Sequence, residues 1–208
     1  MTKIYAATAF AGVLAFLGAS AWYVLSIPVD DAFSECRQGQ VAGGDIGGAF
    51  TLVNTQGQTV TDKDVLTKPS LVYFGYTFCP DVCPLDMSRN VEAVDLLAEK
   101  GIEVTPVFIS IDPERDTPEV LAGYAENLHP ALIALTGSTD QVKAASQAYK
   151  TFYQKQDTGD EFYLVDHSTF TYLVLPERGF VDFFRREVTS EQMSETVACF
   201  LEAGNAGG

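Results

Sequence analysis

The chain has 208 residues, of which 47% are hydrophobic, and this is enough apolar side chain for one domain with its own core. Its formal net charge is −15 at pH 7, and every acidic side chain follows residue 29. Such a negative balance argues against nucleic acid as a partner, because the phosphate backbone repels an acidic surface.

The N-terminal residues predict a membrane anchor. Residues 4–27 contain no charged side chain, and this run exceeds the roughly 20 residues that a helix needs to cross a bilayer. Lys3 precedes the run, and Asp30 and Asp31 follow it. Because a short cationic N-terminal side stays in the cytoplasm, the rest of the chain is expected outside it. We therefore predict a single-pass transmembrane helix within residues 1–28, in an inner (cytoplasmic) membrane, with the domain in the periplasm.

A cleaved signal peptide is the alternative for the same residues. Ala19-Ser20-Ala21 resembles a cleavage site. The apolar run continues beyond it through residues 22–25, which makes it longer than a typical signal-peptide core. The length of the run favours the anchor.

Residues 29–48 are predicted to be a flexible tether between the anchor and the domain. Glycine is frequent in this stretch, and glycine-rich segments behave as flexible chains. The glycines are Gly39, Gly43, Gly44, Gly47 and Gly48.

The folded domain is predicted to span residues 49–204. The expected elements in chain order are strands at 50–53 and 70–76, a helix at 82–100, a strand at 104–111, a helix at 117–127, a strand at 131–135, a helix at 138–152, a hairpin of 170–175 and 180–185, and a last helix that opens near Thr189 and ends before Gly204. Strands that alternate with helices and end in a hairpin and a helix indicate an α/β fold with a mixed central sheet flanked by helices. This is thioredoxin-like architecture.

Two cysteines stand where the strand at 70–76 gives way to a helix, in Cys79-Pro80-Asp81-Val82-Cys83. A helix N-terminus favours a thiolate, because the helix dipole lowers the thiol pKa. A thiolate pair can act as a redox dithiol, in which Cys79 and Cys83 are catalytic residues, or it can bind a soft metal ion. Two packing residues or a static disulfide are the plain alternative.

The chain has two histidines, and their positions differ. His129 follows a predicted helix and precedes a proline, which indicates a structural or solvated loop residue. His167 lies just before the strand at 170–175. In a thioredoxin-like sheet, the loop before this strand faces the reactive cysteines. We therefore predict that His167 can reach Cys79 and Cys83.

Three separated motifs carry a resemblance to a known family. They are residues 75–84 (Gly-Tyr-Thr-Phe-Cys-Pro-Asp-Val-Cys-Pro), 111–118 (Ile-Asp-Pro-Glu-Arg-Asp-Thr-Pro) and 165–168 (Val-Asp-His-Ser). Over residues 45–203 the chain resembles the Sco/SenC family of membrane-anchored copper chaperones. The resemblance implies one copper ion, Cu(I) or Cu(II), bound by Cys79, Cys83 and His167, with Asp81 shaping the loop.

The resemblance also implies delivery of copper to the dinuclear centre of cytochrome c oxidase subunit II. Because a disulfide between Cys79 and Cys83 cannot bind copper, a periplasmic thiol reductant is an implied partner, together with a copper donor. Two thiolates and one imidazole suit soft copper. A Cys₂His set with water is also a plausible zinc site, although zinc is disfavoured by the three-residue cysteine spacing and the missing fourth protein ligand.

Two other functions use the same residues. The protein can be a thiol–disulfide reductase that keeps a partner's cysteines open for metal, with Cys79 as the attacking thiol, or it can be a redox or copper sensor. Thioredoxin-type exchangers usually carry a proline before the facing strand, whereas residues 167–169 here contain none. This difference favours the carrier, and whether the protein is also an enzyme is left open.

Two further features complete the predictions. Residues 112–116 combine three acids with Arg115 around Pro113, which fits a solvated turn or a partner-docking segment. Cys36 lies in the tether, and Cys199 falls off the apolar face of the last helix. In an oxidising compartment we expect these two to form a disulfide that ties the tether to the domain, with free thiols as the alternative.

Overall fold

The computed structural model describes residues 12–23, 33–37, 46–156, 159 and 162–206. Its centre is a seven-stranded mixed sheet in the order β2-β1-β5-β4-β3-β8-β9, and β6 and β7 form a separate two-stranded sheet. The strands are β1 (Thr51–Asn54), β2 (Thr59–Thr61), β3 (Ser70–Gly75), β4 (Thr105–Ser110), β5 (Ile133–Thr136), β6 (Tyr153–Lys155), β7 (Val165–His167), β8 (Thr171–Leu175) and β9 (Gly179–Phe184).

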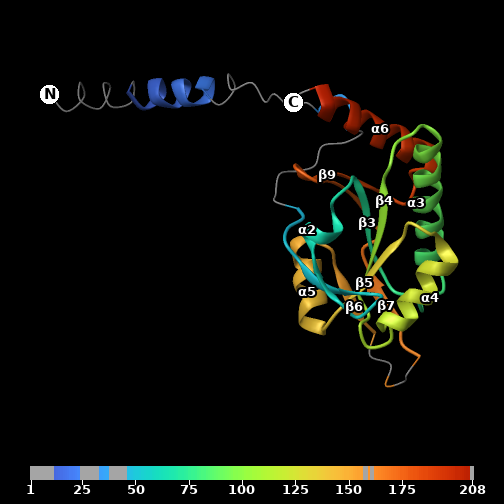
Figure 1. Ribbon diagram of the computed structural model, residues 1–208. Coiled ribbons are helices and arrows are strands. Elements are labelled where there is room, and N and C mark those ends of the chain that lie inside the picture. The colour runs from blue at the N-terminus through green and yellow to red at the C-terminus, as the bar shows by residue number, and fades with distance from the viewer. Residues whose placement is uncertain (1–11, 24–32, 38–45, 157–158, 160–161, 207–208) are drawn as a thin grey trace.

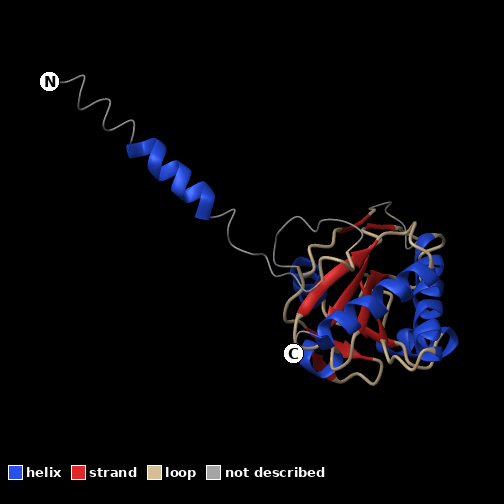
Figure 2. Ribbon diagram, turned by 90° about the horizontal axis from the view of Figure 1, so that it is seen from above, coloured by secondary structure: helices blue, strands red, loops and turns tan. Residues whose placement is uncertain are grey.

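Helices cover both faces of the large sheet (Figures 1 and 2). They are α2 (Asp62–Val65), α3 (Val82–Glu99), α4 (Pro118–Leu128), α5 (Thr139–Ala148) and α6 (Ser190–Ala206). In Figure 1, α3 and α4 lie on one side of the sheet, and α2 and α5 lie on the other. The predicted mixed α/β fold is confirmed.

The alternation of side chains along β3 explains this layering. All six residues of β3 are buried, and successive side chains of a strand point to opposite faces. Tyr73 hydrogen-bonds Asp86 of α3 on one face, while the Phe74 ring lies 5.3 Å from the ring of Tyr149 at the end of α5 on the other. A central strand that is buried on both faces reads as a continuous apolar run in the sequence.

A second core lies between the sheet and the helices α3 and α6. It includes Leu71 at the start of β3, Leu97 near the end of α3 and Phe200 on α6. Two residues of the expected tether, Phe33 and Cys36, are buried in the same core. The structure joins Cys36 to Cys199 of α6 by a disulfide, as expected from the sequence. The rest of the expected tether that the structure describes is residues 34–35, 37 and 46–48.

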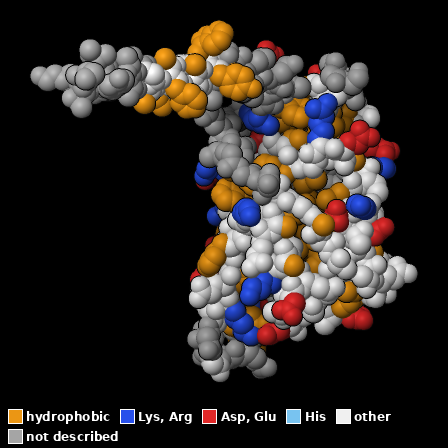
Figure 3. Space-filling view, turned by 90° about the vertical axis from the view of Figure 1, so that its left-hand side faces the viewer, with side chains coloured by type: hydrophobic (Ala, Val, Ile, Leu, Met, Phe, Trp, Pro, Cys, Tyr) orange, Lys and Arg blue, Asp and Glu red, His pale blue; other side chains and the backbone are white. Residues whose placement is uncertain are grey.

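The predicted transmembrane run lies partly outside the described residues. Residues 12–23 are helical, and their large hydrophobic side chains are exposed, as the orange atoms of this segment show in Figure 3. Across the residues that the structure describes, no helix is both long enough and apolar enough to pass through a bilayer.

Several element boundaries differ from the sequence-based expectation. The sequence predicts a helix at 138–152, but α5 ends at Ala148, and Lys150 adopts a positive φ of 53° that ends the helical path. The last helix was expected to stop before Gly204, but α6 continues to Ala206. Strand β7 was not expected at all, and it places His167 at a strand end instead of in a loop.

Candidate metal centre

The two cysteines lie at the carboxyl end of β3, where the chain turns into α3. Residues 76–81 form a loop, here called the cysteine loop, between Gly75 of β3 and Val82 of α3. Cys79 lies in this loop and Cys83 in the first turn of α3. The Cys79 backbone N–H donates to the Tyr76 carbonyl at 3.2 Å, so that the loop folds back on itself and brings Cys79 under the helix N-terminus.

The histidine comes from the small second sheet. His167 ends β7 and pairs with Tyr153 of β6, and the next residue, Ser168, donates its N–H to the Phe152 carbonyl at 2.9 Å. We call β6 together with residues 162–167 the histidine ribbon. Because His167 is fixed in a strand pair, its position depends on the ribbon as a whole.

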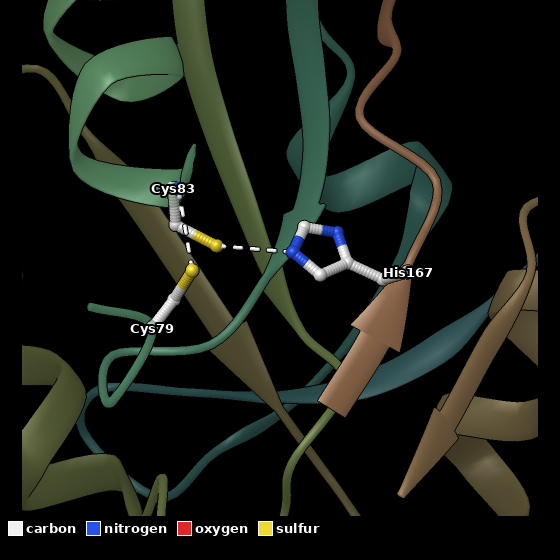
Figure 4. Close-up of side chains that lie close together, drawn as sticks. All are labelled: Cys79, Cys83 and His167. Atoms are coloured by element: carbon white, nitrogen blue, oxygen red, sulfur yellow. Dashed lines mark hydrogen bonds between the residues drawn. The ribbon is translucent and has the colours of Figure 1, made fainter. Parts of the chain in front are cut away.

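The structure brings the three predicted side chains together (Figure 4). The Cys83 sulfur lies 3.3 Å from Nε2 of His167, and the Cys83 backbone N–H lies 3.4 Å from the Cys79 sulfur. All three potential ligand atoms lie within 4.8 Å of one another. Among the described residues this is the one group of three or more Cys, His, Asp or Glu side chains close enough to share a metal ion.

The two thiols differ in acidity. Burial acts to raise the pKa of Cys79, but hydrogen bonds from the backbone N–H groups of Cys83, Asp81 and Val82 outweigh it and hold the pKa below its ordinary value. Burial raises the pKa of Cys83, which is only 2% exposed. Cys79 is therefore the thiol that ionises first, as expected for a sulfur beside a helix N-terminus.

His167 directs the lone pair of its Nε2 toward the Cys83 sulfur. Its Nδ1 lies 2.8 Å from the Ser168 carbonyl oxygen. Because a carbonyl oxygen only accepts, Nδ1 must carry the proton and Nε2 is left as the acceptor. Burial lowers the pKa of His167, which favours the same neutral form. A second hydrogen bond that fixes the tautomer is typical of metal-binding histidines.

Two tyrosine rings enclose His167. The rings of Tyr73 and Tyr76 meet the imidazole edge-on, with centroids 6.2 and 5.8 Å away. Gly75 completes the close packing, because an added Cβ there would lie 2.8 Å from the Tyr73 ring and 3.0 Å from the Cys83 sulfur. A lone glycine inside an apolar strand is a signal of close approach that was available in the sequence.

A buried acid next to the site was not found from the sequence. Asp86 of α3 is 3% exposed and accepts a hydrogen bond from Tyr73 at 3.0 Å. Arg89 and Arg186 lie 3.9 and 3.5 Å from its carboxylate. In the sequence, Asp86 and Arg89 are three residues apart on one predicted helix, which is typical of an exposed ion pair. No local pattern indicates that Asp86 is buried and Arg89 partly buried.

The acidic segment at 112–116 has a structural role. Asp116 is fully buried and accepts hydrogen bonds from the Thr77 N–H at 3.1 Å and from the hydroxyls of Thr77 and Ser110. It therefore pins the start of the cysteine loop to the end of β4. These contacts support the turn for Asp116, but the expectation that the turn is solvated is wrong for Asp112 and Asp116, which are both buried.

The second histidine lies outside this group. His129 follows α4, accepts a hydrogen bond from the Ala131 N–H at Nδ1 and contacts Asp95 of α3 through Nε2 at 3.1 Å. Both nitrogens of this loop histidine are engaged in local structure, as the sequence indicated.

Fold and site together define a class: a mixed α/β protein in which a dithiol at a strand-to-helix corner faces an imidazole from a neighbouring ribbon. The SCO1/SenC family model matches residues 38–202. Protein SenC of Rhodobacter capsulatus is 51% identical over 203 residues, which cover 97% of this chain and 92% of that protein. The chain belongs to the SCO1/SenC family.

Solved structures agree with this assignment. The copper-bound ScoI of Arabidopsis thaliana is 39% identical, with a TM-score of 0.71 over 76% of this chain and 99% of that one. Copper-bound yeast Sco1 is 36% identical, with a TM-score of 0.72 over 76% of this chain and 90% of that one. Both of these similar proteins were solved with copper.

Proposed function

We propose that this protein is a copper carrier, which holds one copper ion between Cys79, Cys83 and His167 and passes it to the dinuclear copper centre of cytochrome c oxidase subunit II. The observation that carries the proposal is the convergence of two sulfurs and one imidazole nitrogen within 4.8 Å. Support also comes from the family relationship and from the copper in similar solved proteins.

The donor set favours copper over zinc. Thiolates are soft ligands that select Cu(I), and the added imidazole also suits Cu(II). Structural zinc sites are usually closed by four protein ligands, whereas the group here has three. An incomplete ligand set also suits a cargo, since an ion that must leave needs a position at which a recipient's ligand can attack.

The first test is copper titration of the reduced protein and of its His167→Ala variant. We expect copper affinity to fall strongly in the variant, because one of three ligands is lost, while exchange through Cys79 and Cys83 persists. His129→Ala is the matched control, because His129 hydrogen-bonds Asp95 and Ala131 and lies outside the Cys79, Cys83 and His167 group. Equal copper affinity in His167→Ala and the unchanged protein would remove the histidine from the site.

The second test concerns the recipient. Copper-loaded protein is mixed with the reduced soluble domain of subunit II, and the spectrum of the dinuclear centre is followed. Transfer of copper supports the carrier, whereas loaded protein that keeps its copper in the presence of the empty recipient contradicts delivery to subunit II.

A reductase is the second candidate, and the acidity of Cys79 favours it. A thiol with a depressed pKa carries the thiolate that attacks a disulfide, and backbone hydrogen bonds lower this pKa in Cys79. The copper-free dithiol would reduce a partner's disulfide, and its own oxidation to a Cys79–Cys83 disulfide would balance the two electrons. Rapid reduction of oxidised subunit II by copper-free protein, together with negligible copper affinity, would make this the function.

We also propose that the chain is anchored by its N-terminal helix in the cytoplasmic membrane, with the domain in the periplasm. This placement is supported by the uncharged run at 4–27, with Lys3 before it and Asp30 after it. Extraction of the full chain from membranes by detergent but not by high salt is the expected result, and release by salt would contradict it.

A further inference from the structure

An arginine lies between the two segments that carry the metal centre. Arg115 belongs to the loop that joins β4 to α4. Its guanidinium carbon lies 3.7 Å from the ring centroid of Tyr163, 4.8 Å from that of Phe78 and 5.7 Å from that of Tyr76. A guanidinium within about 6 Å of an aromatic ring is attracted to it, and the attraction strengthens when water is excluded. We call Arg115 with Tyr163 and Phe78 the arginine stack.

Hydrogen bonds fix the guanidinium in this position. Its Nε donates to the Asp112 carboxylate, and its Nη1 donates to the Tyr163 backbone carbonyl at 3.0 Å. The Tyr163 hydroxyl donates to the same carboxylate at 2.7 Å. The planar fork of an arginine makes these bonds while it stacks on a ring, and a lysine ammonium cannot reproduce both.

The ring partners of Arg115 are neighbours of the metal ligands in the sequence. Phe78 immediately precedes Cys79 in the cysteine loop. Tyr163 belongs to the histidine ribbon, and the residue after next, Val165, begins the strand that ends at His167. The Val165 N–H also donates to the Tyr76 hydroxyl at 3.2 Å, which joins the ribbon directly to the cysteine loop. The arginine stack therefore joins the segment that supplies a sulfur to the segment that supplies the nitrogen.

The histidine ribbon depends on such a junction, because it is not part of the large sheet. Strand β7 pairs with β6 alone, so the hydrogen bonds of the main sheet do not hold His167 in place. A two-stranded pair by itself is only marginally stable in water. Contacts between the ribbon and the rest of the domain must therefore set the distance from His167 to the sulfurs.

We propose that Arg115 is a positioning residue for the copper site, which holds the histidine ribbon against the cysteine loop so that His167 stays within reach of Cys79 and Cys83. This inference rests on the proposed copper-binding function. Arg115 itself touches neither sulfur nor imidazole, and it acts through Tyr163 and Phe78.

The first test measures copper affinity in Arg115→Lys, by competition with a chelator of known affinity. We expect the affinity to fall about 10- to 100-fold, the range seen when an outer partner of a metal ligand is lost. The matched control is Arg178→Lys. The Arg178 guanidinium stacks 5.1 Å from the Phe33 ring in the second core, so the same kind of contact is removed away from the site, and copper affinity should not change. Unchanged affinity in Arg115→Lys overturns the proposal.

The second test separates positioning from a general loss of stability. In the His167→Ala background, Arg115→Lys should have no further effect on copper affinity, because the ligand on which it acts is gone. Losses that multiply would mean that Arg115 acts on the fold and not on His167, and would overturn the proposal. With Cu(II) bound, the hyperfine signal of the imidazole nitrogen should weaken in Arg115→Lys and stay unchanged in Arg178→Lys.

A third measurement needs no copper, so it distinguishes failure of this inference from failure of the proposed function. In the reduced metal-free protein, Arg115→Lys should speed amide hydrogen exchange in the histidine ribbon while β3 and β4 stay protected. If the unchanged protein binds no copper, the proposed function fails, and this measurement still decides whether Arg115 holds the ribbon. Should Arg115→Lys not fold, Tyr163→Leu removes the ring and hydroxyl from the other side of the same contact. If amide exchange in the histidine ribbon is then as slow as in the unchanged protein, the inference is overturned.

Discussion

The two cysteine pairs of this chain have opposite environments. Cys36 and Cys199 are joined by a disulfide beside the second core. Cys79 and Cys83 are free thiols at the carboxyl end of β3, and a helix N-terminus and an imidazole face them. The first pair is 163 residues apart in the sequence, whereas the second pair is four residues apart.

This difference shows how cysteine can serve two purposes in one chain, as a stabilising cross-link and as a pair of free thiols. Cross-linking distant residues restricts the unfolded chain strongly, so the long-range pair adds stability. Linking residues four apart restricts the unfolded chain much less, so the short-range pair can open and close at a smaller cost to stability. The cysteine pair whose cross-link would stabilise the fold less is therefore the pair that faces His167.

The largest effect should come from replacing a sulfur of the free pair. Cys83→Ser puts a hard oxygen where a soft ligand is needed. We expect a loss of copper affinity beyond the roughly 100-fold that removal of an outer partner costs, with little change in unfolding. Chelator competition and thermal unfolding measure the two quantities. Near-normal copper affinity in this variant would mean that the sulfurs are not the ligands.

Replacing the bridged pair should do the reverse. The Cys36→Ser/Cys199→Ser double variant should lose about 2–5 kcal/mol of unfolding free energy, because the unfolded chain regains its freedom. Copper affinity should stay unchanged. Denaturant unfolding with and without a reductant measures the loss, and the reductant should destabilise only the unchanged protein. A simultaneous loss of copper affinity would show that the disulfide and the Cys79, Cys83 and His167 group are coupled and not independent.

A smaller effect is expected from Gly75→Ala. The added methyl group must push aside the Tyr73 ring or the Cys83 sulfur, and overpacking of this kind costs about 1–3 kcal/mol. Copper affinity should fall together with stability, since the displaced sulfur is a ligand. Gly123→Ala is the control, because an added Cβ there meets nothing within 4 Å. If the two variants had the same unfolding free energy and the same copper affinity, the close packing of Gly75 against Tyr73 and Cys83 would be refuted.

The smallest effect is a difference in pH dependence within the free pair. Only the thiolate reacts with an alkylating reagent, and the reaction speeds up as the pH rises through each pKa. The pKa of Cys79 is lowered and that of Cys83 is raised, so Cys79 should be modified at a lower pH than Cys83. Mass spectrometry of peptides locates the label. Earlier modification of Cys83 would reverse the assignment of the attacking thiol.

The sequence predicted the framework well where residue patterns are local. The strand predicted at 70–76 and the helices predicted at 82–100 and 117–127 match β3, α3 and α4 to within one residue at each end. The corner that holds Cys79 and Cys83 follows from these elements. The meeting of His167 with the sulfurs was expected from topology.

The parts that the sequence did not reveal depend on long-range contacts. Tyr153-Gln154-Lys155 has no apolar alternation, so β6 is visible only through its pairing with β7. Asp86 reads as a surface acid because its partners Tyr73 and Arg186 come from other elements. No local pattern encodes a contact between strands and a helix that are distant in sequence.

The Cys36–Cys199 disulfide also fixes the end of the domain at which residues 33–36 are attached. Phe33 and Cys36 pack with Leu71 at the amino end of β3, while the free sulfurs lie past its carboxyl end. The six residues of β3, at about 3.3 Å each, make the strand roughly 20 Å long, and this length separates the disulfide end of the domain from the free sulfurs. If the chain is anchored as proposed, the anchor joins the domain at the end opposite to the one that presents the free sulfurs.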